Sequence, residues 1–271
     1  MADSSSSSCR VASVQSAPVL FDVAGNCRRI LDAFSQVEAD VVVFPELATC
    51  GYFFLSEEEV RGVSMDLSDE AMVSMREVSD AENKTLVVGF AERAANGFFN
   101  SAAIFRPHCE PMVYRKTHLF YKERNCFSQG DSGFFVVDEP RTGARIGVMI
   151  CYDWRFPEAA RSLALRGADI VLCPSNLVTT LSGKVMPARA IENKVNLVVT
   201  NRWGTETRDD EELVFRGESA IYDYKGERLA VSPAGADDII IADLDFMSTR
   251  NKMFNSINDI FTDRRPDMYE R

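Results

Sequence analysis

The chain has 271 residues, of which 46% are hydrophobic and 26% charged. These proportions are near the globular average and exclude a wholly disordered or fibrous protein, and the length fits one domain of ordinary enzyme size. The formal net charge of −11 makes nucleic acids and anionic membranes poor partners, because an acidic surface repels polyanions. The 7 cysteines are odd in number and show no C-x-x-C spacing, so we expect free thiols in a reducing compartment.

The chain shows no sign of a membrane or export segment. No apolar run approaches the roughly 20 residues that are needed to cross a bilayer. The serine-rich start lacks the cationic and apolar regions of a secretory signal. We therefore expect a cytoplasmic protein without a membrane partner, in which residues 1–9 form a disordered tail and residues 10–271 form a single domain.

Short apolar runs alternate with amphipathic stretches along nearly the whole chain. The first strand is predicted at residues 11–15, followed by a helix over residues 23–37 and a fully buried strand at residues 41–44. Further strands are predicted at residues 85–91, 101–105, 112–117, 134–137, 145–150, 170–173, 197–200, 218–222 and 239–244. A second helix is predicted over residues 157–166, because Pro157 suits its first position. Together these elements favour a layered α/β domain, and the acidic stretch at residues 206–212 is interpreted as a solvated loop.

Glu46 is the first of three residues that stand at predicted strand ends. Pro45 before it removes a ladder donor and turns the strand out of the sheet. A carboxylate at such a place loses water, which raises its pKa towards the working range of a general base. The alternative is a glutamate that has simply reached solvent.

Lys116 is the second of these residues. Strand alternation places it on one face with Met112 and Tyr114, so its ammonium group could be a partly enclosed, fixed positive charge. The alternative is a surface lysine whose stem covers apolar neighbours while its charge stays in water.

Cys151 is the third, and it lies between a buried strand and the helix that begins at Pro157. A cysteine on a strand-to-helix turn lies near backbone N–H groups, which favour anions and thiolates, and Gly147 allows close approach behind it. The alternative is a small buried hydrophobe, which suits Cys173 well. Cys151 differs because the polar and aromatic residues 152–155 follow it, as in a pocket wall.

Three motifs occur in order around these residues: Phe44-Pro45-Glu46, Tyr114-Arg115-Lys116-Thr117-His118-Leu119-Phe120, and Cys151-Tyr152-Asp153-Trp154-Arg155-Phe156-Pro157-Glu158. Their key residues are separated by 70 and 35 positions (116 − 46 and 151 − 116). In motifs and spacing the chain resembles the nitrilase (carbon–nitrogen hydrolase) superfamily over nearly its whole length. It is most similar to small archaeal-type nitrilases and related amidases.

This resemblance implies a four-layer αββα sandwich and a Glu–Lys–Cys triad. Glu46 would be the general base, and Cys151 the nucleophile that forms a thioester from an amide or a thioimidate from a nitrile. Lys116 and the backbone N–H of Tyr152 would stabilise the oxyanion. Glu123 matches a second family glutamate that orients Lys116 and the substrate.

The resemblance also suggests residues that line the pocket, although each could equally serve packing or surface: Tyr52, Asn176, Trp154, Phe120, Arg202 and Trp203. His118 becomes a structural residue beside the site. Neither an organic cofactor nor a metal is expected. Subunits would pair as a homodimer or higher homo-oligomer, with the segment after about residue 245 at the interface.

The expected reaction is hydrolysis of a small amide, of amidase or ω-amidase type, which releases ammonia and a carboxylic acid. Hydrolysis of small nitriles or dinitriles, or of N-carbamoyl amides, is the alternative within the superfamily. A non-catalytic binding or regulatory homologue is an alternative from a different class, as is a metal-dependent hydrolase built on His108, Cys109 and His118.

Overall fold

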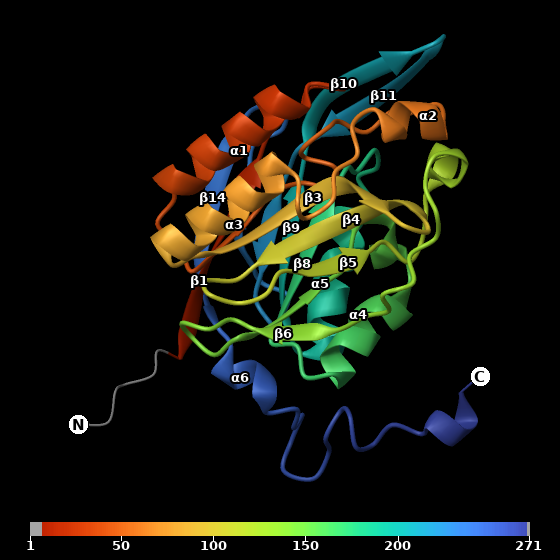
Figure 1. Ribbon diagram of the computed structural model, residues 1–271. Coiled ribbons are helices and arrows are strands. Elements are labelled where there is room, and N and C mark those ends of the chain that lie inside the picture. Colours follow the sequence, from red (N-terminus) through yellow and green to blue (C-terminus); the bar gives the residue numbers. More distant parts are fainter. Residues whose placement is uncertain (1–6, 270–271) are drawn as a thin grey trace.

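Two six-stranded sheets lie face to face in the computed structural model, which describes residues 7–269, and helices cover their outer sides (Figure 1). The first sheet has the order β14-β1-β2-β3-β4-β5. Its strands β1, β2 and β3 are parallel, whereas β14, β4 and β5 are antiparallel to their neighbours. The bounds of this sheet are β1 Ser8–Gln15, β2 Val41–Val43, β3 Thr85–Ala94, β4 Gly97–Phe105, β5 Met112–Arg115 and β14 Asp238–Asp245.

The second sheet has the order β13-β12-β9-β8-β7-β6, with β7, β8 and β9 parallel. Its bounds are β6 Val136–Asp138, β7 Arg145–Val148, β8 Ile170–Ser175, β9 Asn196–Asn201, β12 Ala220–Tyr222 and β13 Arg228–Val231. Parallel strands end at one edge of a sheet, so the residues that follow β2 and β7 can meet where the two sheets face each other.

Two pairs of helices form the outer layers. Helices α1 (Val23–Gln36) and α3 (Glu70–Glu82) cover the first sheet, whereas α4 (Pro157–Leu165) and α5 (Ser182–Asn193) cover the second. The side chain of Asp22 caps α1 by accepting a 3.0 Å hydrogen bond from the Gly25 amide. Short helices lie in the connections: α2 (Glu57–Arg61), α6 (Met247–Arg250) and the 3-10 turns η1 (Tyr121–Asn125), η2 (Cys151–Arg155) and η3 (Pro266–Met268).

The alternation of side chains along β1 shows how the four layers are held together. Ala12 and Val14 face the α1–α3 layer, and Val11 faces the second sheet. Ser13 stands between Ala12 and Val14 in the sequence, and its hydroxyl lies 2.7 Å from the hydroxyl of Thr200 on β9. This buried hydrogen bond joins the two sheets. The expected four-layer αββα sandwich is thereby confirmed.

Several predicted boundaries differ from the structure. β1 begins at Ser8, so Ser8 and Cys9 belong to a strand instead of the expected tail, of which residues 1–6 lie outside the described part. The interpretation of residues 206–212 as a solvated loop is wrong, because they belong to a hairpin formed by β10 (Trp203–Arg208) and β11 (Glu211–Arg216). The charged side chains of these residues conceal the alternation of a strand in the sequence. One face of the hairpin is buried only because it packs against the domain.

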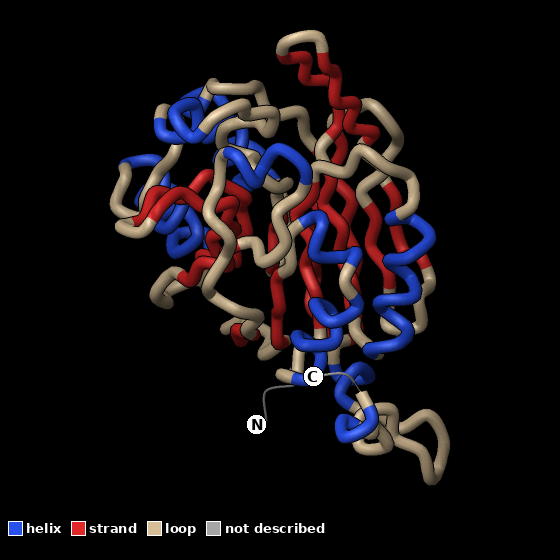
Figure 2. The backbone as a smooth tube through the Cα atoms, turned by 90° about the vertical axis from the view of Figure 1, so that its right-hand side faces the viewer, coloured by secondary structure: helices blue, strands red, loops and turns tan. Residues whose placement is uncertain are grey.

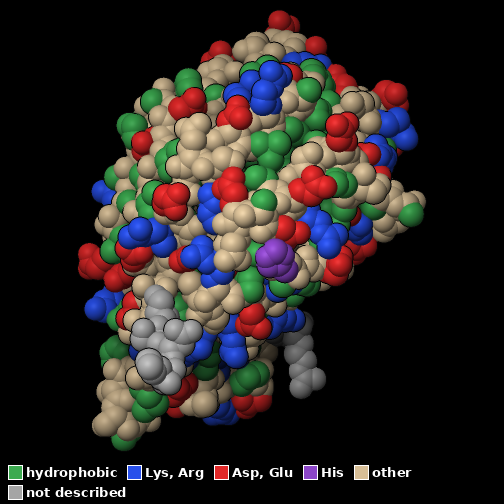
Figure 3. Space-filling model, turned by 60° about the vertical axis from the view of Figure 1, so that its left-hand side comes forward, with side chains coloured by type: hydrophobic (Ala, Val, Ile, Leu, Met, Phe, Trp, Pro, Cys, Tyr) green, Lys and Arg blue, Asp and Glu red, His purple; other side chains and the backbone are tan. Residues whose placement is uncertain are grey.

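Two segments project from the domain. The β10–β11 hairpin extends from one end, and the chain after α6 extends from the other (Figure 2). The latter carries strongly exposed apolar side chains, among them Phe254 at 81% and Ile257 at 82% exposure. Acidic and basic side chains are interspersed over the face in Figure 3. Within residues 7–269, none of the helices combines the length and apolar character that crossing a membrane requires.

Candidate active site

Glu46 lies three residues beyond the end of β2 and is completely buried. The turn that carries it fits tightly against β3, because a Cβ atom on Gly89 would lie only 2.6 Å from the Glu46 Cα atom and 2.4 Å from the Pro45 carbonyl oxygen. Glycine at position 89 is therefore required for this approach. On the other side, the Asn176 amide donates a 3.0 Å hydrogen bond to the Glu46 backbone carbonyl.

Lys116 follows β5 directly, and its ammonium group is buried between two carboxylates. Its Nζ atom lies 2.5 Å from Glu46 Oε1 and 2.7 Å from Glu123 Oε1. The Asn100 side chain on β4 donates a second hydrogen bond of 2.8 Å to Glu46 Oε1. Glu46 Oε2, in contrast, is buried without a hydrogen-bond partner among the described residues.

Glu123 lies in η1 and holds Lys116 from the other side. Tyr52 donates its hydroxyl proton to Glu123 Oε1 over 2.6 Å, and the Phe120 amide donates to Glu123 Oε2 over 3.2 Å. These contacts hold the carboxylate of Glu123, which is itself buried, in place against Lys116.

Cys151 begins η2, three residues after β7 ends at Val148. Its φ angle of 42° lies in the left-handed region, which costs a non-glycine residue about 1–2 kcal/mol. Behind the turn, a Cβ atom on Gly147 would lie 2.8 Å from the Leu163 side chain of α4, so the close approach expected at this glycine is between β7 and a helix side chain.

A buried carboxylate ties the Cys151 turn to the segment that carries Lys116. Asp153 Oδ2 accepts hydrogen bonds from the Ile150 amide (2.9 Å) and the Tyr114 hydroxyl (2.7 Å). Asp153 Oδ1 accepts from the His118 amide (3.0 Å) and lies 2.7 Å from His118 Nδ1. Tyr114 and His118 flank Lys116 in sequence, so Asp153 sets the position of Lys116 relative to Cys151.

The charges in this cluster determine its protonation. Burial by itself lowers the pKa of Lys116, but the carboxylates of Glu123 and Glu46 raise it more, so the pKa lies above its usual value and the amine stays charged. Burial raises the pKa of Glu123, although Lys116 opposes this shift. Burial and the Glu46 charge also raise the pKa of the Cys151 thiol well above its usual value, against the effect of Lys116. This shift favours the neutral thiol over the thiolate.

The remaining predicted pocket residues fall into two groups. Phe120 and Tyr152 lie together beside the site, with ring centroids 5.1 Å apart. Trp154 is buried in the hydrophobic cluster that also contains Cys151. Arg202 forms a buried ion pair with Glu206, and Trp203 donates its indole N–H to Asp237, so neither is brought to the triad.

Sequence reasoning missed two polar residues that support the site, Asn100 and Glu206, and it named Asp153 only as part of a pocket wall. Asn100 stands within the largely apolar run of residues 98–105, which was the available signal. Glu206 gave none, because it stands in an acidic stretch. Its carboxylate accepts hydrogen bonds from the amides of Tyr52 (3.2 Å) and Phe53 (2.7 Å), and it thereby holds the segment whose tyrosine contacts Glu123.

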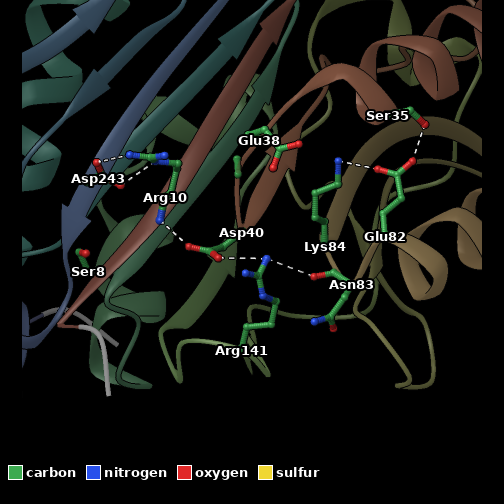
Figure 4. A pocket seen from close by; sticks show the side chains of 11 residues that line it. Ser8, Arg10, Ser35, Glu38, Asp40, Glu82, Asn83, Lys84, Arg141 and Asp243 are labelled. Atoms are coloured by element: carbon green, nitrogen blue, oxygen red, sulfur yellow. Dashed lines mark hydrogen bonds and ion pairs between the residues drawn. The ribbon is translucent and has the colours of Figure 1, made fainter. Parts of the chain in front are cut away.

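A cavity of about 670 Å³ lies at the opposite end of the first sheet, and it is lined by charged side chains that pair with one another (Figure 4). Arg10 contacts Asp243, Arg141 contacts Asp40, and Lys84 contacts Glu82. Its lining includes the first residues of β1 and residues that directly precede β2 and β3, whereas Glu46 follows the end of β2. In the described part of the chain, no three His, Cys, Asp or Glu side chains are grouped so as to hold a metal ion.

Comparison with known proteins agrees with this fold and geometry. A model of the carbon–nitrogen hydrolase family matches residues 10–252. A nitrilase from Pyrococcus abyssi is 38% identical over 97% of this chain and 99% of its own length, and a citrullinase from Francisella tularensis is 32% identical over 86% of each. The crystal structure of an amidase from Nesterenkonia sp. superposes with a TM-score of 0.78 at 26% identity, covering 96% of this chain and 94% of the amidase.

The two facing sheets with their outer helices, together with the family match, define an α/β hydrolytic enzyme. The chain belongs to the carbon–nitrogen hydrolase family, within the nitrilase superfamily that its motifs resemble.

Proposed function

We propose that this enzyme hydrolyses the carbon–nitrogen bond of a small amide through a thioester on Cys151. The observation that carries this proposal is the position of the Lys116 ammonium between Glu46 and Glu123, at 2.5 and 2.7 Å, while Glu46 Oε2 has no hydrogen-bond partner within residues 7–269. One carboxylate oxygen is thus used to hold the lysine, and the other is free to accept a proton.

In the first half of the reaction, the Cys151 sulfur attacks the amide carbonyl carbon while Glu46 takes the thiol proton. Negative charge moves to the carbonyl oxygen, where Lys116 Nζ and the Tyr152 backbone N–H stabilise it, each by about 3 kcal/mol. The carbon–nitrogen bond then breaks, and the leaving nitrogen takes the proton from Glu46 and departs as ammonia.

In the second half, Glu46 removes a proton from water, which attacks the thioester carbonyl. The carbon–sulfur bond breaks, the thiol regains its proton, and a carboxylic acid leaves. The raised pKa of Cys151 suits this route, because a neutral thiol beside a carboxylate releases its proton only as the new bond forms.

Nitrile hydrolysis is the second candidate, and the likeness to the Pyrococcus nitrilase favours it. The same attack of Cys151 on a nitrile carbon would give a thioimidate, which two waters convert to acid and ammonia. The likeness to a citrullinase similarly supports ureido or N-carbamoyl substrates as a further variant.

Ammonia release from a panel of short amides, nitriles and N-carbamoyl amines tests the proposal. We expect Cys151→Ala to abolish turnover and Glu46→Gln to be nearly inactive, because the first lacks the nucleophile and the second the base. Cys27→Ala, which alters a buried thiol on α1, is the matched control and should retain activity. If the wild type releases no ammonia from any of these compounds, the chain is a non-catalytic homologue.

We further propose that the chain from β1 onward forms one functional domain that assembles as a homodimer in the cytoplasm. The exposed apolar side chains after α6, such as Phe254 and Ile257, support an interface there, since burial of such groups stabilises association. All seven cysteines are free, which supports a reducing compartment.

A further inference from the structure

Glu46 and two asparagines that contact it carry buried oxygen atoms that receive no hydrogen bond from the described residues. Within residues 7–269, eight buried side-chain atoms lack a hydrogen-bond partner, and three of them belong to Glu46, Asn100 and Asn176. These three are Glu46 Oε2 and the two Oδ1 atoms, all of which are acceptors. The three residues are at most 3% exposed. Because a buried acceptor without a donor costs free energy, the three oxygens favour a ligand that carries N–H groups.

The contacts of both asparagines with Glu46 bring these oxygens close together. Asn100 Nδ2 donates to Glu46 Oε1 over 2.8 Å, and Asn176 Nδ2 donates to the Glu46 backbone carbonyl over 3.0 Å. In an asparagine side chain the oxygen and the nitrogen are bonded to one carbon, so each Oδ1 stands next to a nitrogen that contacts Glu46. The amide nitrogens are thus used inside the protein, whereas the acceptor oxygens are left for a ligand.

The same asparagines also contact the other two residues of the triad. Burial raises the pKa of the Cys151 thiol, and a hydrogen bond from the Asn176 backbone opposes this rise, so Asn176 contacts both Glu46 and Cys151. The Asn100 backbone carbonyl accepts a 2.8 Å hydrogen bond from the Lys116 amide. A group that is bonded to the carbon attacked by Cys151 would therefore stand beside the three acceptors.

The leaving nitrogen of a primary amide matches three acceptors in number. In the bound substrate this nitrogen has two N–H bonds. After Cys151 has added to the carbonyl carbon, Glu46 passes the thiol proton to the nitrogen, which then carries three N–H bonds and a positive charge. The carbon–nitrogen bond breaks with its electron pair on the nitrogen, the carbonyl double bond re-forms from the oxyanion, and ammonia leaves. Acceptors that gain a hydrogen bond at this stage stabilise the transition state more than the substrate.

We propose that Asn100 and Asn176 bind the amino group of the substrate through their side-chain oxygens, while Glu46 Oε2 exchanges the proton. The substrate class is then the primary amides. A nitrile nitrogen carries no hydrogen, and an alkylated amide nitrogen carries fewer, so both leave buried acceptors unpaired. This inference rests on the proposed amide hydrolysis, and it names the residues that favour an amide over a nitrile.

Butyramide and methyl butyrate test the inference, because both would give the same butyryl thioester on Cys151 and differ only in the group that leaves. Ammonia leaves with three N–H bonds and methanol with one O–H bond, although both leaving groups take a proton from Glu46. We expect Asn100→Leu and Asn176→Leu to lower kcat/KM for butyramide about tenfold more than for the ester, which corresponds to about 1.4 kcal/mol. Glu46→Gln should lower both values alike.

Asn193→Leu on α5 is the matched control, since Asn193 is also fully buried and its Oδ1 has no partner among the described residues. We expect it to keep the wild-type ratio of amide to ester hydrolysis. Alkylation of Cys151 by methyl iodide, followed by mass spectrometry, is a second reference, because it needs the thiol and its base but involves no amino group. In Asn100→Leu and Asn176→Leu, alkylation should slow less than butyramide hydrolysis.

Equal losses of amide hydrolysis, ester hydrolysis and alkylation in these two variants would mean that the asparagines only position Glu46. That result would overturn the inference while amide hydrolysis stands. Absence of ammonia from butyramide and from every other short amide in the wild type would instead contradict the proposed function.

Discussion

The buried ion pair at the base of the β10–β11 hairpin gives the sharpest test of how the site is supported. Glu206 pairs with Arg202, and the two side chains are only 6% and 2% exposed. The same carboxylate accepts hydrogen bonds from the amides of Tyr52 and Phe53, and the Arg202 guanidinium lies 4.3 Å from the centroid of the Phe215 ring. Removal of Glu206 therefore affects a buried charge and two buried amides at once.

We expect Glu206→Ala to lower the free energy of unfolding by about 3–5 kcal/mol, because Arg202 is left as an uncompensated buried charge. Most of this loss is the desolvation of the remaining charge and not the strength of the pair. The free energy of unfolding of the double variant Arg202→Met with Glu206→Leu should therefore exceed that of Glu206→Ala by about 2 kcal/mol. The amides of Tyr52 and Phe53 remain unpaired in it, so recovery should be incomplete.

Urea unfolding followed by circular dichroism, at one fixed protein concentration, measures these differences. Glu211→Ala in the same hairpin is the control, because Glu211 pairs with Lys122 where both side chains are about one-third exposed, at 35% and 30%. Such a pair contributes about 0–1 kcal/mol. A loss of less than about 1 kcal/mol in Glu206→Ala, equal to that of the control, would refute the argument that burial makes this pair critical.

Three further predictions concern the triad and the buried thiols. Tyr52→Phe should reduce kcat about tenfold or more with little change in KM, since it removes a charge-assisted bond to Glu123 worth about 1.5–3 kcal/mol; an unchanged kcat would exclude a positioning role for Tyr52. In urea unfolding, the free energy of unfolding of Cys151→Gly should exceed that of Cys151→Ala by about 1 kcal/mol, because glycine tolerates the positive φ angle. The reverse order would argue against backbone strain at this position. Burial raises the pKa of Cys173 to about 12, so the folded state keeps this proton longer than the unfolded state does. The stability that the Cys173 thiol contributes is complete below about pH 8.5 and falls as the pH rises, by about 2 kcal/mol at pH 10. When the free energy of unfolding is measured from pH 7 to 10, Cys173→Ala should show a smaller decline than the wild type.

The layered fold could be predicted from the sequence because it depends on local patterns. Continuous apolar runs such as Val41–Val43 indicate strands buried on both faces, and the first position of α4 is marked by Pro157. Helices α3 and α5 were not predicted. The buried apolar side chains of α3 are only Met72 and Met75, and α5 contains Pro187, which masks a helical pattern.

The reacting residues of the candidate site could also be named from the sequence, because Glu46, Lys116 and Cys151 each follow a strand and stand in a recognisable motif. Their supports could not be named in the same way. Asn100 and Glu206 reach the site from β4 and β10, and no spacing in the chain indicates which carboxylate or tyrosine they approach. The pocket role expected of Trp154 likewise depends on the direction of a side chain, which no spacing in the chain indicates.

The sequence by itself determined the class of fold, the family and the identity of the four polar residues at the proposed site. These depend on side-chain periodicity and on short motifs, both of which are local. Only the tertiary structure decided that Lys116 lies between Glu46 and Glu123, and that one oxygen of Glu46 has no partner among the described residues. These features arise where segments far apart in the chain bury charges together, and the energy of a buried charge depends on what surrounds it in space.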